Sequence, residues 1–314
     1  MHHWLMKAAP FQYARPSTLA EACELLAEYG PDAKLIAGGQ SLVPMMAMRL
    51  ARPAWLIDIS RLGELQERAA PSARTGNTDS DFAVGAGVRQ GVMERDAATR
   101  ADLPLLARAL RWVGHLQTRN LGTIGGSIAH GDPAAEIPLV ACVLDARLEL
   151  RDRSTAIDVP ARAFFLGPMI TAMDPRQCLT RIRFPVWRNP AKGVRRGCAF
   201  EEVSIRHGDF ALVSACAQLD LDADGRCLRL ELGVGGASPA PLTLPGLAAQ
   251  LTGVRLDAAA IAAAADAAAG MTEPEGDLHA SADYRRHLAR VLVGRALREA
   301  VNDAATTSGS QATA

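Results

Sequence analysis

The fold is decided by two stretches in which a glycine pair stands just before a serine. The first is A-G-G-Q-S-L, residues 37–42, and the second is T-I-G-G-S-I-A-H-G-D-P-A-A-E, residues 123–136. Paired glycines permit left-handed backbone angles and the close approach of a ligand. Successive main-chain N–H groups in such turns form concave nests that hold phosphate oxygens. Because each stretch stands where a strand is expected to end, the sequence indicates two candidate nests for one diphosphate.

The alternative is that both glycine pairs simply make tight turns, since a lone G-G-x-S is a weak signal. Ser41 and Ser127 favour the ligand interpretation, because each adds a hydroxyl donor to its nest. Other nucleotide-binding signatures are missing: no G-x-G-x-x-G follows a predicted strand, and no G-x-x-x-x-G-K-[ST] loop occurs. The segment at Gly126 also lacks the last glycine of G-x-S-x-G, which excludes a hydrolase elbow.

Hydrophobic periodicity divides the chain into an N-terminal region, residues 1–62, a second region, 63–187, and a third, 188–305. A small polar tail, 306–314, is predicted to be disordered. The first region is predicted to contain a helix from Ser17, its N-cap, to Tyr29, and Gly30 should end that helix. Strands are predicted over residues 33–37 and 55–59.

The second and third regions alternate helical and extended patterns. In the second region, strands are predicted over 82–86 and 178–184, with a helix over 103–113 between them. The third region should contain three antiparallel strands, 200–203, 212–221 and 227–234, followed by helices over 257–269 and 284–301. The sequence therefore predicts an α+β protein whose C-terminal domain holds a three-stranded antiparallel sheet and helices.

Composition excludes several classes of function. Lysine plus arginine equals aspartate plus glutamate at 34 each, so no electrostatic feature indicates a nucleic-acid partner. No apolar run is long enough to insert in a membrane. The first ten residues show no secretory signal. The six cysteines show no C-x-x-C spacing, so neither a metal site nor a disulfide scaffold is expected, and a cytoplasmic location follows.

Four collinear motifs resemble one family, the FAD-binding medium subunits of molybdenum hydroxylases of the carbon monoxide dehydrogenase and xanthine dehydrogenase type. A-G-G-Q-S-L-V-P-M-M-x-x-R-L, from Ala37, resembles their first FAD motif, and V-G-H-L-Q-T-R-N-L-G-T-I-G-G-S, from Val113, resembles their second. E-E-V-S-I-R-H-G-D-F-A-L-V, from Glu201, and Y-R-R-H-L-A-R-V-L-V-G-R-A-L, from Tyr284, resemble segments of their third domain. The resemblance implies a two-subdomain FAD-binding fold of the vanillyl-alcohol-oxidase/PCMH type.

The resemblance also implies which residues hold the FAD. One side of the pyrophosphate is assigned to Ala37, Gly38, Gly39, Gln40 and Ser41. The other side is assigned to Thr123, Ile124, Gly125, Gly126 and Ser127. Asp132 matches a position that reaches ribityl or ribose hydroxyls, although it could instead cap a helix, and Phe210 matches one beside the flavin ring, although it could instead be core. The chain departs from the family where Ile205 replaces a basic residue and Leu121 replaces an arginine.

The resemblance further implies an electron-transfer subunit that carries no catalytic acid or base. Electrons would pass from a molybdenum-cofactor large subunit, through a small subunit with two [2Fe-2S] clusters, to this FAD and then to an external acceptor. The expected assembly is a dimer of heterotrimers. Two alternatives stay open at this point, a stand-alone FAD-dependent oxidase of the same fold and a flavin-free assembly subunit.

Overall fold

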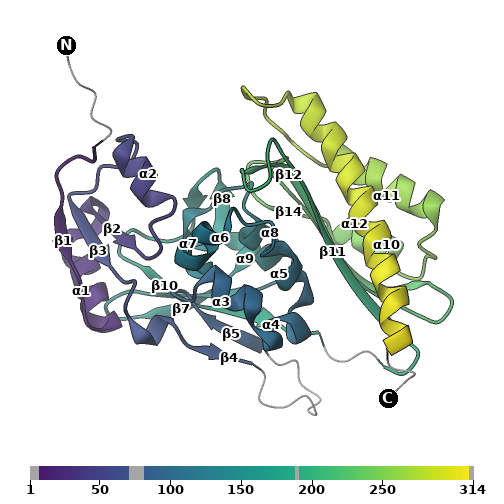
Figure 1. Cartoon of the computed structure of the whole chain (residues 1–314), viewed down its shortest axis with the longest axis horizontal. Helices are drawn as coiled ribbons and strands as arrows, with labels where there is room; N and C mark the ends of the chain where they lie inside the picture. The colour runs from purple at the N-terminus through teal and green to yellow at the C-terminus, as the bar shows by residue number, and fades with distance from the viewer. Residues whose placement is uncertain (1–6, 71–80, 188–190, 311–314) are drawn as a thin grey trace.

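The computed structural model describes residues 7–70, 81–187 and 191–310. Their strands form three sheets and a separate hairpin, and helices cover the sheets, which confirms the predicted α+β class. The sheets follow one another along the chain, from purple through teal to green in Figure 1. Each sheet falls inside one of the three predicted regions, whose boundaries stay a prediction. The adjacent His2 and His3, which the sequence favours as part of a disordered end rather than a metal site, lie outside the described residues.

The first sheet is parallel, with the strand order β1–β3–β2. Its strands are β1 (Gln12–Ala14), β2 (Ala33–Ile36) and β3 (Trp55–Asp58). The helical elements of this region are α1 (Leu19–Tyr29), α2 (Leu42–Ala47) and the 3-10 helices η1 (Gly30–Asp32) and η2 (Gly63–Leu65). Parallel strands need a crossover, and the glycine turn and α2 form the one between β2 and β3.

Helix α1 begins one residue later than the sequence indicated. The N-cap is Thr18, whose hydroxyl accepts a hydrogen bond from the Glu21 N–H at 3.1 Å. Ser17 instead donates its own N–H and hydroxyl to the Glu21 carboxylate. Thr18 rather than Ser17 is the N-cap because it stands three residues before Glu21, which is the spacing of a capping box. Gly30 ends the helix as predicted, with a φ of 50°.

The central sheet is antiparallel, with the strand order β4–β5–β10–β6–β7. Its strands are β4 (Arg68–Ala69), β5 (Asp81–Gly85), β6 (Arg147–Arg151), β7 (Ala156–Pro160) and β10 (Cys178–Pro185), and β8 (Phe165–Gly167) pairs with β9 (Ile170–Thr171) in the hairpin. Its helices are α3 (Gln90–Arg95), α4 (Ala97–Asp102), α5 (Pro104–Ala109), α6 (Leu116–Leu121), α7 (Ile124–His130), α8 (Glu136–Val143) and α9 (Ala161–Phe164).

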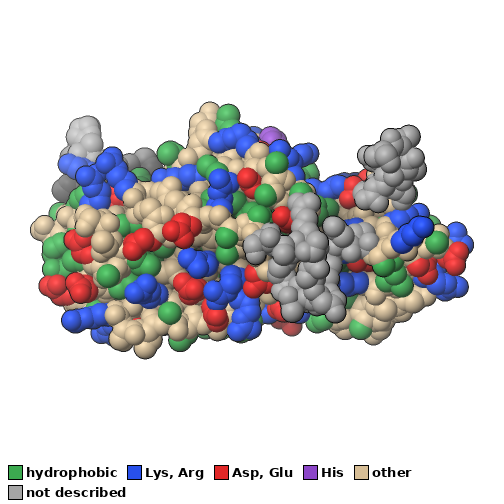
Figure 2. All heavy atoms as spheres, turned by 90° about the horizontal axis from the view of Figure 1, so that it is seen from below, with side chains coloured by type: hydrophobic (Ala, Val, Ile, Leu, Met, Phe, Trp, Pro, Cys, Tyr) green, Lys and Arg blue, Asp and Glu red, His purple; other side chains and the backbone are tan. Residues whose placement is uncertain are grey.

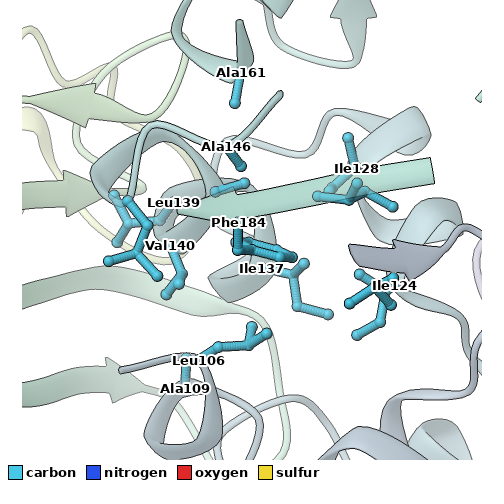
Figure 3. Close-up of a cluster of buried hydrophobic side chains, with 14 of the residues drawn as sticks. Leu106, Ala109, Ile124, Ile128, Ile137, Leu139, Val140, Ala146, Ala161 and Phe184 are labelled. Atoms are coloured by element: carbon cyan, nitrogen blue, oxygen red, sulfur yellow. The ribbon is translucent and has the colours of Figure 1, made fainter. Parts of the chain in front are cut away.

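The core of the central region anchors helix α7. Ile124 and Ile128, one turn apart on α7, are fully buried and point toward Ile137 of α8 and Phe184 of β10 (Figure 3). Burying side chains of this size contributes about 1.5–3 kcal/mol each. The start of α7, and with it the second glycine stretch, is therefore held rigidly.

The C-terminal sheet has four strands rather than the predicted three, in the order β11–β12–β13–β14. Its strands are β11 (Arg195–Ser204), β12 (Ala211–Leu221), β13 (Cys227–Gly235) and β14 (Leu242–Thr243). The fourth strand is only two residues long, which is too short to show an alternating pattern in sequence. Helices α10 (Pro245–Leu251), α11 (Ala258–Gly270) and α12 (Ala282–Ser310) complete the region.

The two faces of this sheet belong to different cores. Cys198, Phe200 and Cys216 pack with the central region, whereas the alternating residues Ala199 and Ala217 pack with the last helices. Figure 1 shows α12 lying along the outer face of β11 and β12. The sheet is thus a partition between the central region and α11–α12.

Helix α12 runs beyond its predicted end at Val301. It continues through Ser310, so the part of the predicted disordered tail from Thr306 to Ser310 is helical. Ala304 on this helix is fully buried in the C-terminal core, and such packing can override weak helix propensity. Among the described residues, no helix combines the length and the apolar character that a membrane span requires. On the face shown in Figure 2, acidic and basic side chains are interspersed.

Candidate functional site

The first glycine stretch forms the connection between β2 and α2. Gly39 has a φ of 68°, the left-handed conformation that the sequence predicted, but Gly38 has no positive φ. Gly38 is needed for a different reason: a Cβ there would lie 2.4 Å from the Leu121 carbonyl oxygen. The turn therefore uses one glycine for its backbone angle and the other for a close approach to helix α6.

The main-chain donors of this turn are free. Within the described part of the chain, the N–H groups of Gly38, Gly39, Gln40 and Ser41 donate no hydrogen bond. The Ser41 hydroxyl precedes α2 without capping it. Four consecutive unpaired N–H groups beside a hydroxyl are the donor set that a phosphate needs.

The second glycine stretch differs from its prediction, because it is the start of a helix and not a turn after a strand. Thr123 is the N-cap of α7, and its hydroxyl accepts from the Gly126 N–H at 2.9 Å. Gly125 and Gly126 have no positive φ. A Cβ at Gly125 would lie 2.3 Å from the Ala86 Cβ, so this glycine permits the helix to pack on the end of β5.

The main-chain donors of residues 124–127 in the second stretch are already used inside the protein. The Ile124 N–H donates to the Val88 carbonyl and the Gly125 N–H to the Ala86 carbonyl, both at 2.9 Å. The Ser127 N–H donates to the Thr123 carbonyl at 3.2 Å. The interpretation of this stretch as a nest of free N–H groups is therefore wrong. What it does offer is the half-buried Ser127 hydroxyl, which makes no hydrogen bond in the described residues.

The structure brings the two stretches together, although 80 residues separate them in sequence. A Cβ at Gly38 would also lie 2.8 Å from the Gly122 Cα, and Gly122 immediately precedes Thr123. The Arg89 guanidinium donates to the Leu121 carbonyl and so stabilises the junction of the two stretches, where Gly38 meets residues 121 and 122. One ligand group can therefore meet both stretches at this junction.

Asp132 stands in the loop between α7 and α8. Its carboxylate accepts from the Ala134 N–H at 2.8 Å, which makes a local turn, and the N-cap of α8 is Ala135. The alternative that Asp132 caps a helix is therefore not what the structure shows. Gly131, with a φ of 68°, ends α7 and accepts from the Met169 N–H at 2.9 Å, so the β8–β9 hairpin supports this loop.

Phe210 lies in the loop between β11 and β12 and is 71% exposed, so it is not a core residue. The same loop packs on the central region: a Cβ at Gly208 would lie 2.3 Å from the His115 ring. His207 makes an edge contact with Trp112, at 6.4 Å between ring centroids. The loop therefore presents Phe210 to the surface beside the junction of the two regions.

Two buried carboxyl groups near this site were missed by sequence reasoning. Glu136 is the first residue of α8, and Glu202 lies on the face of β11 that carries Phe200; each is 8% exposed. Glutamate is almost never fully buried unless paired, so surface exposure was the default expectation for both. The signal that could have revealed the burial of Glu202 is its position in β11, two residues after Phe200 and therefore on the same face of the strand.

Comparison with known families identifies the class of this fold and site. The family model described as "FAD binding domain in molybdopterin dehydrogenase" matches residues 9–187, and "CO dehydrogenase flavoprotein C-terminal domain" matches residues 198–300. The chain is thus an FAD-binding protein. It belongs to the family of FAD-binding medium subunits of molybdopterin dehydrogenases, as its motifs predicted.

Individual relatives agree over almost the whole chain. The 6-hydroxypseudooxynicotine dehydrogenase complex subunit alpha of Paenarthrobacter nicotinovorans is 34% identical over 97% of this chain and 99% of its own. The carbon monoxide dehydrogenase medium chain of Hydrogenophaga pseudoflava is 35% identical over 92% of this chain and 96% of its own. The solved quinoline 2-oxidoreductase of Pseudomonas putida 86 superposes with a TM-score of 0.86 at 33% identity, covering 95% of this chain and 99% of that one.

Proposed function

We propose that this chain holds FAD between its two glycine stretches and passes electrons from iron–sulfur clusters on a partner subunit to an external acceptor. The partners are a molybdenum-cofactor large subunit and a small subunit with two [2Fe-2S] clusters, assembled as a dimer of heterotrimers. The observation that carries the proposal is the set of four unpaired N–H groups at Gly38–Ser41, in contact with the second stretch.

The residues of the junction fit the diphosphate of FAD. The free N–H groups of residues 38–41 supply donors to its oxygens, and the Ser41 and Ser127 hydroxyls supply two more from either side. Neutral donors of this kind bind phosphate without a lysine or arginine. Ile124, Gly125 and Gly126 shape the site, because their N–H groups already donate within the protein, and Ala37 and Thr123 flank the two stretches.

The remaining predicted residues would bind the sugar or ring portions of the cofactor. Asp132 keeps acceptor capacity beyond its bond to Ala134, which suits a hydroxyl donor. Phe210, exposed in the loop between β11 and β12, would cover an aromatic ring of the cofactor. Flavin, when bound, exchanges electrons singly or in pairs, so it links one-electron clusters to a two-electron acceptor.

The cysteines support a division of labour between chains. All six are buried and form no disulfide. Burial raises the pKa of Cys142, Cys178 and Cys198 to about 12, so the thiolate that a cluster requires is disfavoured. The iron–sulfur clusters of the proposed electron path would therefore belong to the small subunit.

The names of the relatives support the assembly. The Hydrogenophaga protein is a medium chain of carbon monoxide dehydrogenase, and a second relative is the "Nicotine 6-hydroxylase medium subunit". A medium chain requires larger and smaller companions. Because this chain spans nearly the full length of these relatives, the same kind of complex is proposed for it.

The test is purification of the native complex through a tag on this chain, followed by metal analysis and absorption spectroscopy. We expect bound flavin, molybdenum and iron, and bleaching of the flavin bands when an oxidisable substrate is added without oxygen. Carbon monoxide, 6-hydroxypseudooxynicotine and quinoline form the first substrate panel. Turnover by the isolated chain would instead favour the stand-alone oxidase, and a complex without flavin would favour the assembly role.

A further inference from the structure

A polar patch interrupts the apolar face that the C-terminal sheet turns toward the central region. Glu202 of β11 pairs with Ser214 of β12, and Ser214 pairs with Gly235 of β13. Directly paired residues of antiparallel strands place their side chains on the same face. This is the face of Phe200 and Cys216, which pack in the central core. Glu202 and Ser214 therefore point toward the central region.

Helix α8 lies against this patch. A Cβ at Gly235 would lie 3.3 Å from Leu139 Cδ2, and a Cβ at Gly233 would lie 2.4 Å from Val143 Cγ2. The Gly236 N–H donates to the Pro133 carbonyl at 2.9 Å, which ties the sheet to the loop before α8. Glu136, at the start of α8, is thereby brought to the same interface as Glu202.

Both carboxyl groups are buried, and the Glu202 carboxyl is incompletely hydrogen-bonded. Glu202 is 8% exposed, and neither its Oε2 atom nor the Ser214 hydroxyl has a hydrogen-bond partner in the described chain. The negative charge of Glu136 acts directly on Glu202. Two ionised carboxylates in such a place would repel each other without compensation, so a single shared proton is the stable arrangement.

The surroundings decide which carboxyl keeps the proton. Burial raises the pKa of Glu202 to about 9, and the Glu136 charge adds to that shift. Burial raises the pKa of Glu136 only to about 7, because its own N–H and the Arg119 charge lower it while Asp132 raises it. Between these two values Glu136 is the carboxylate and Glu202 is the acid.

We propose that Glu202 is a positioning residue of the flavin site, which donates its carboxyl proton in a hydrogen bond to the Glu136 carboxylate. The bond joins the C-terminal sheet to the first residue of α8, next to the loop 131–135 that carries Asp132, and so fixes the shape of that loop for the ligand. The inference rests on the proposed function, because the loop matters only if FAD binds beside it.

The test is the FAD affinity of the flavin-free full-length chain, measured by flavin fluorescence across a pH series. The wild-type protein should bind FAD with constant affinity between about pH 7 and pH 8, where Glu136 is ionised, and its affinity should fall as pH passes about 9, where Glu202 loses the donated proton. E202Q keeps a donor that cannot ionise, so its affinity should stay within about twofold of the wild-type value and lose the alkaline fall. E202A, which removes the donor, should bind about tenfold more weakly than the wild-type protein at pH 8 and should show no alkaline fall.

E201Q is the matched control, because Glu201 is the preceding residue of β11 and points to the opposite face of the sheet. It should keep the wild-type affinity and the wild-type alkaline fall. Thermal unfolding of each flavin-free variant separates ligand binding from folding. Rescue by E202Q with loss by E202A is the result that a merely structural carboxyl would not give.

Two results would overturn the inference. One is an E202Q variant whose affinity still falls above pH 9 in parallel with the wild-type protein. The other is a set of Glu202 variants that change only the melting temperature of the flavin-free chain and leave FAD affinity intact. Both leave the proposed function standing, whereas a wild-type chain that takes up no FAD at any pH would remove the proposed function and this inference together.

Discussion

Gly38–Gly39 and Gly125–Gly126 are each followed closely by a serine, yet their main-chain donors have opposite fates. The N–H groups of residues 38–41 point to no acceptor in the described chain, whereas those of residues 124–127 are all bonded within the protein. The first stretch is therefore available to a ligand, and the second is committed to the fold. The same short motif thus supplies free donors for a ligand in one place and the bonded first turn of a helix in the other.

This difference has a cause in the neighbouring elements. The first stretch follows the edge strand β2 and enters the short helix α2; helix α6 approaches Gly38 closely, but no carbonyl of the described chain accepts from the N–H groups of residues 38–41. The second stretch lies against the end of β5, where the Ala86 and Val88 carbonyls accept its N–H groups. A sequence pattern cannot distinguish the two cases, because the acceptors come from residues some 40 positions away.

The largest expected effect comes from Gly125→Ala, which tests the packing of the second glycine stretch on β5. The new Cβ would lie 2.3 Å from the Ala86 Cβ and 2.6 Å from its Cα, so backbone must move in a buried contact. We expect the flavin-free chain to lose about 3 kcal/mol of unfolding free energy, at the upper end of overpacking costs. Urea unfolding measures it. Unchanged stability would show that α7 does not pack on β5 as described.

Gly38→Ala tests the contact between the stretches. Its Cβ would lie 2.4 Å from the Leu121 carbonyl oxygen. This clash should push the turn of residues 38–41 away from the second stretch. FAD affinity should fall about 100-fold, the equivalent of about 2.7 kcal/mol. Gly63→Ala is the control, because its Cβ would meet nothing within 4 Å. Equal flavin content in the two purified variants would contradict the shared site.

Ser41→Ala and Ser127→Ala compare the hydroxyls contributed by the two stretches. Neither hydroxyl has a partner within the described chain, so their removal should leave the flavin-free chain as stable as before. Each lost hydrogen bond to a charged phosphate should weaken FAD binding about tenfold. Isothermal titration with FAD gives both values. A loss confined to one serine would mean that only one stretch touches the diphosphate.

Thr123→Ala should have the smallest effect, and it should fall on stability. The Thr123 hydroxyl caps α7 through the Gly126 N–H, and loss of such a cap costs about 1 kcal/mol. FAD affinity should change by less than about threefold, because this side chain faces its own helix. Thermal unfolding and FAD titration of the same sample check both statements. Strong loss of affinity with intact stability would place Thr123 on the ligand side.

Sequence reasoning located the elements well where a strong local signal existed. The strand pattern of Leu212–Leu221 and the stop signal at Gly30 were both read correctly. The family motifs placed both glycine stretches at one site, and their contact in the structure is consistent with that placement. The details that failed are those set by tertiary contacts, including the helical state of residues 124–127 and the inward face of Glu202.

The boundaries also show how close alternatives are decided. Ser17 and Thr18 are both good N-caps, and only the distance to Glu21 selects Thr18. The helix of residues 282–310 outlasts its weak C-terminal propensity because Ala304 is buried against the sheet. In both cases the outcome is decided by a contact with another residue, which the helix propensity of a single residue does not include.

Amide hydrogen exchange of the chain with and without FAD tests the comparison between the two stretches most directly. Free N–H groups exchange rapidly, and a bound diphosphate should slow exchange at residues 38–41 by at least about tenfold. The amides of residues 124–127 are bonded within the protein already and should be slow in both states. An exchange rate at residues 38–41 that is the same with and without FAD would contradict the account. Protection by FAD that appears only at residues 124–127 would contradict it as well.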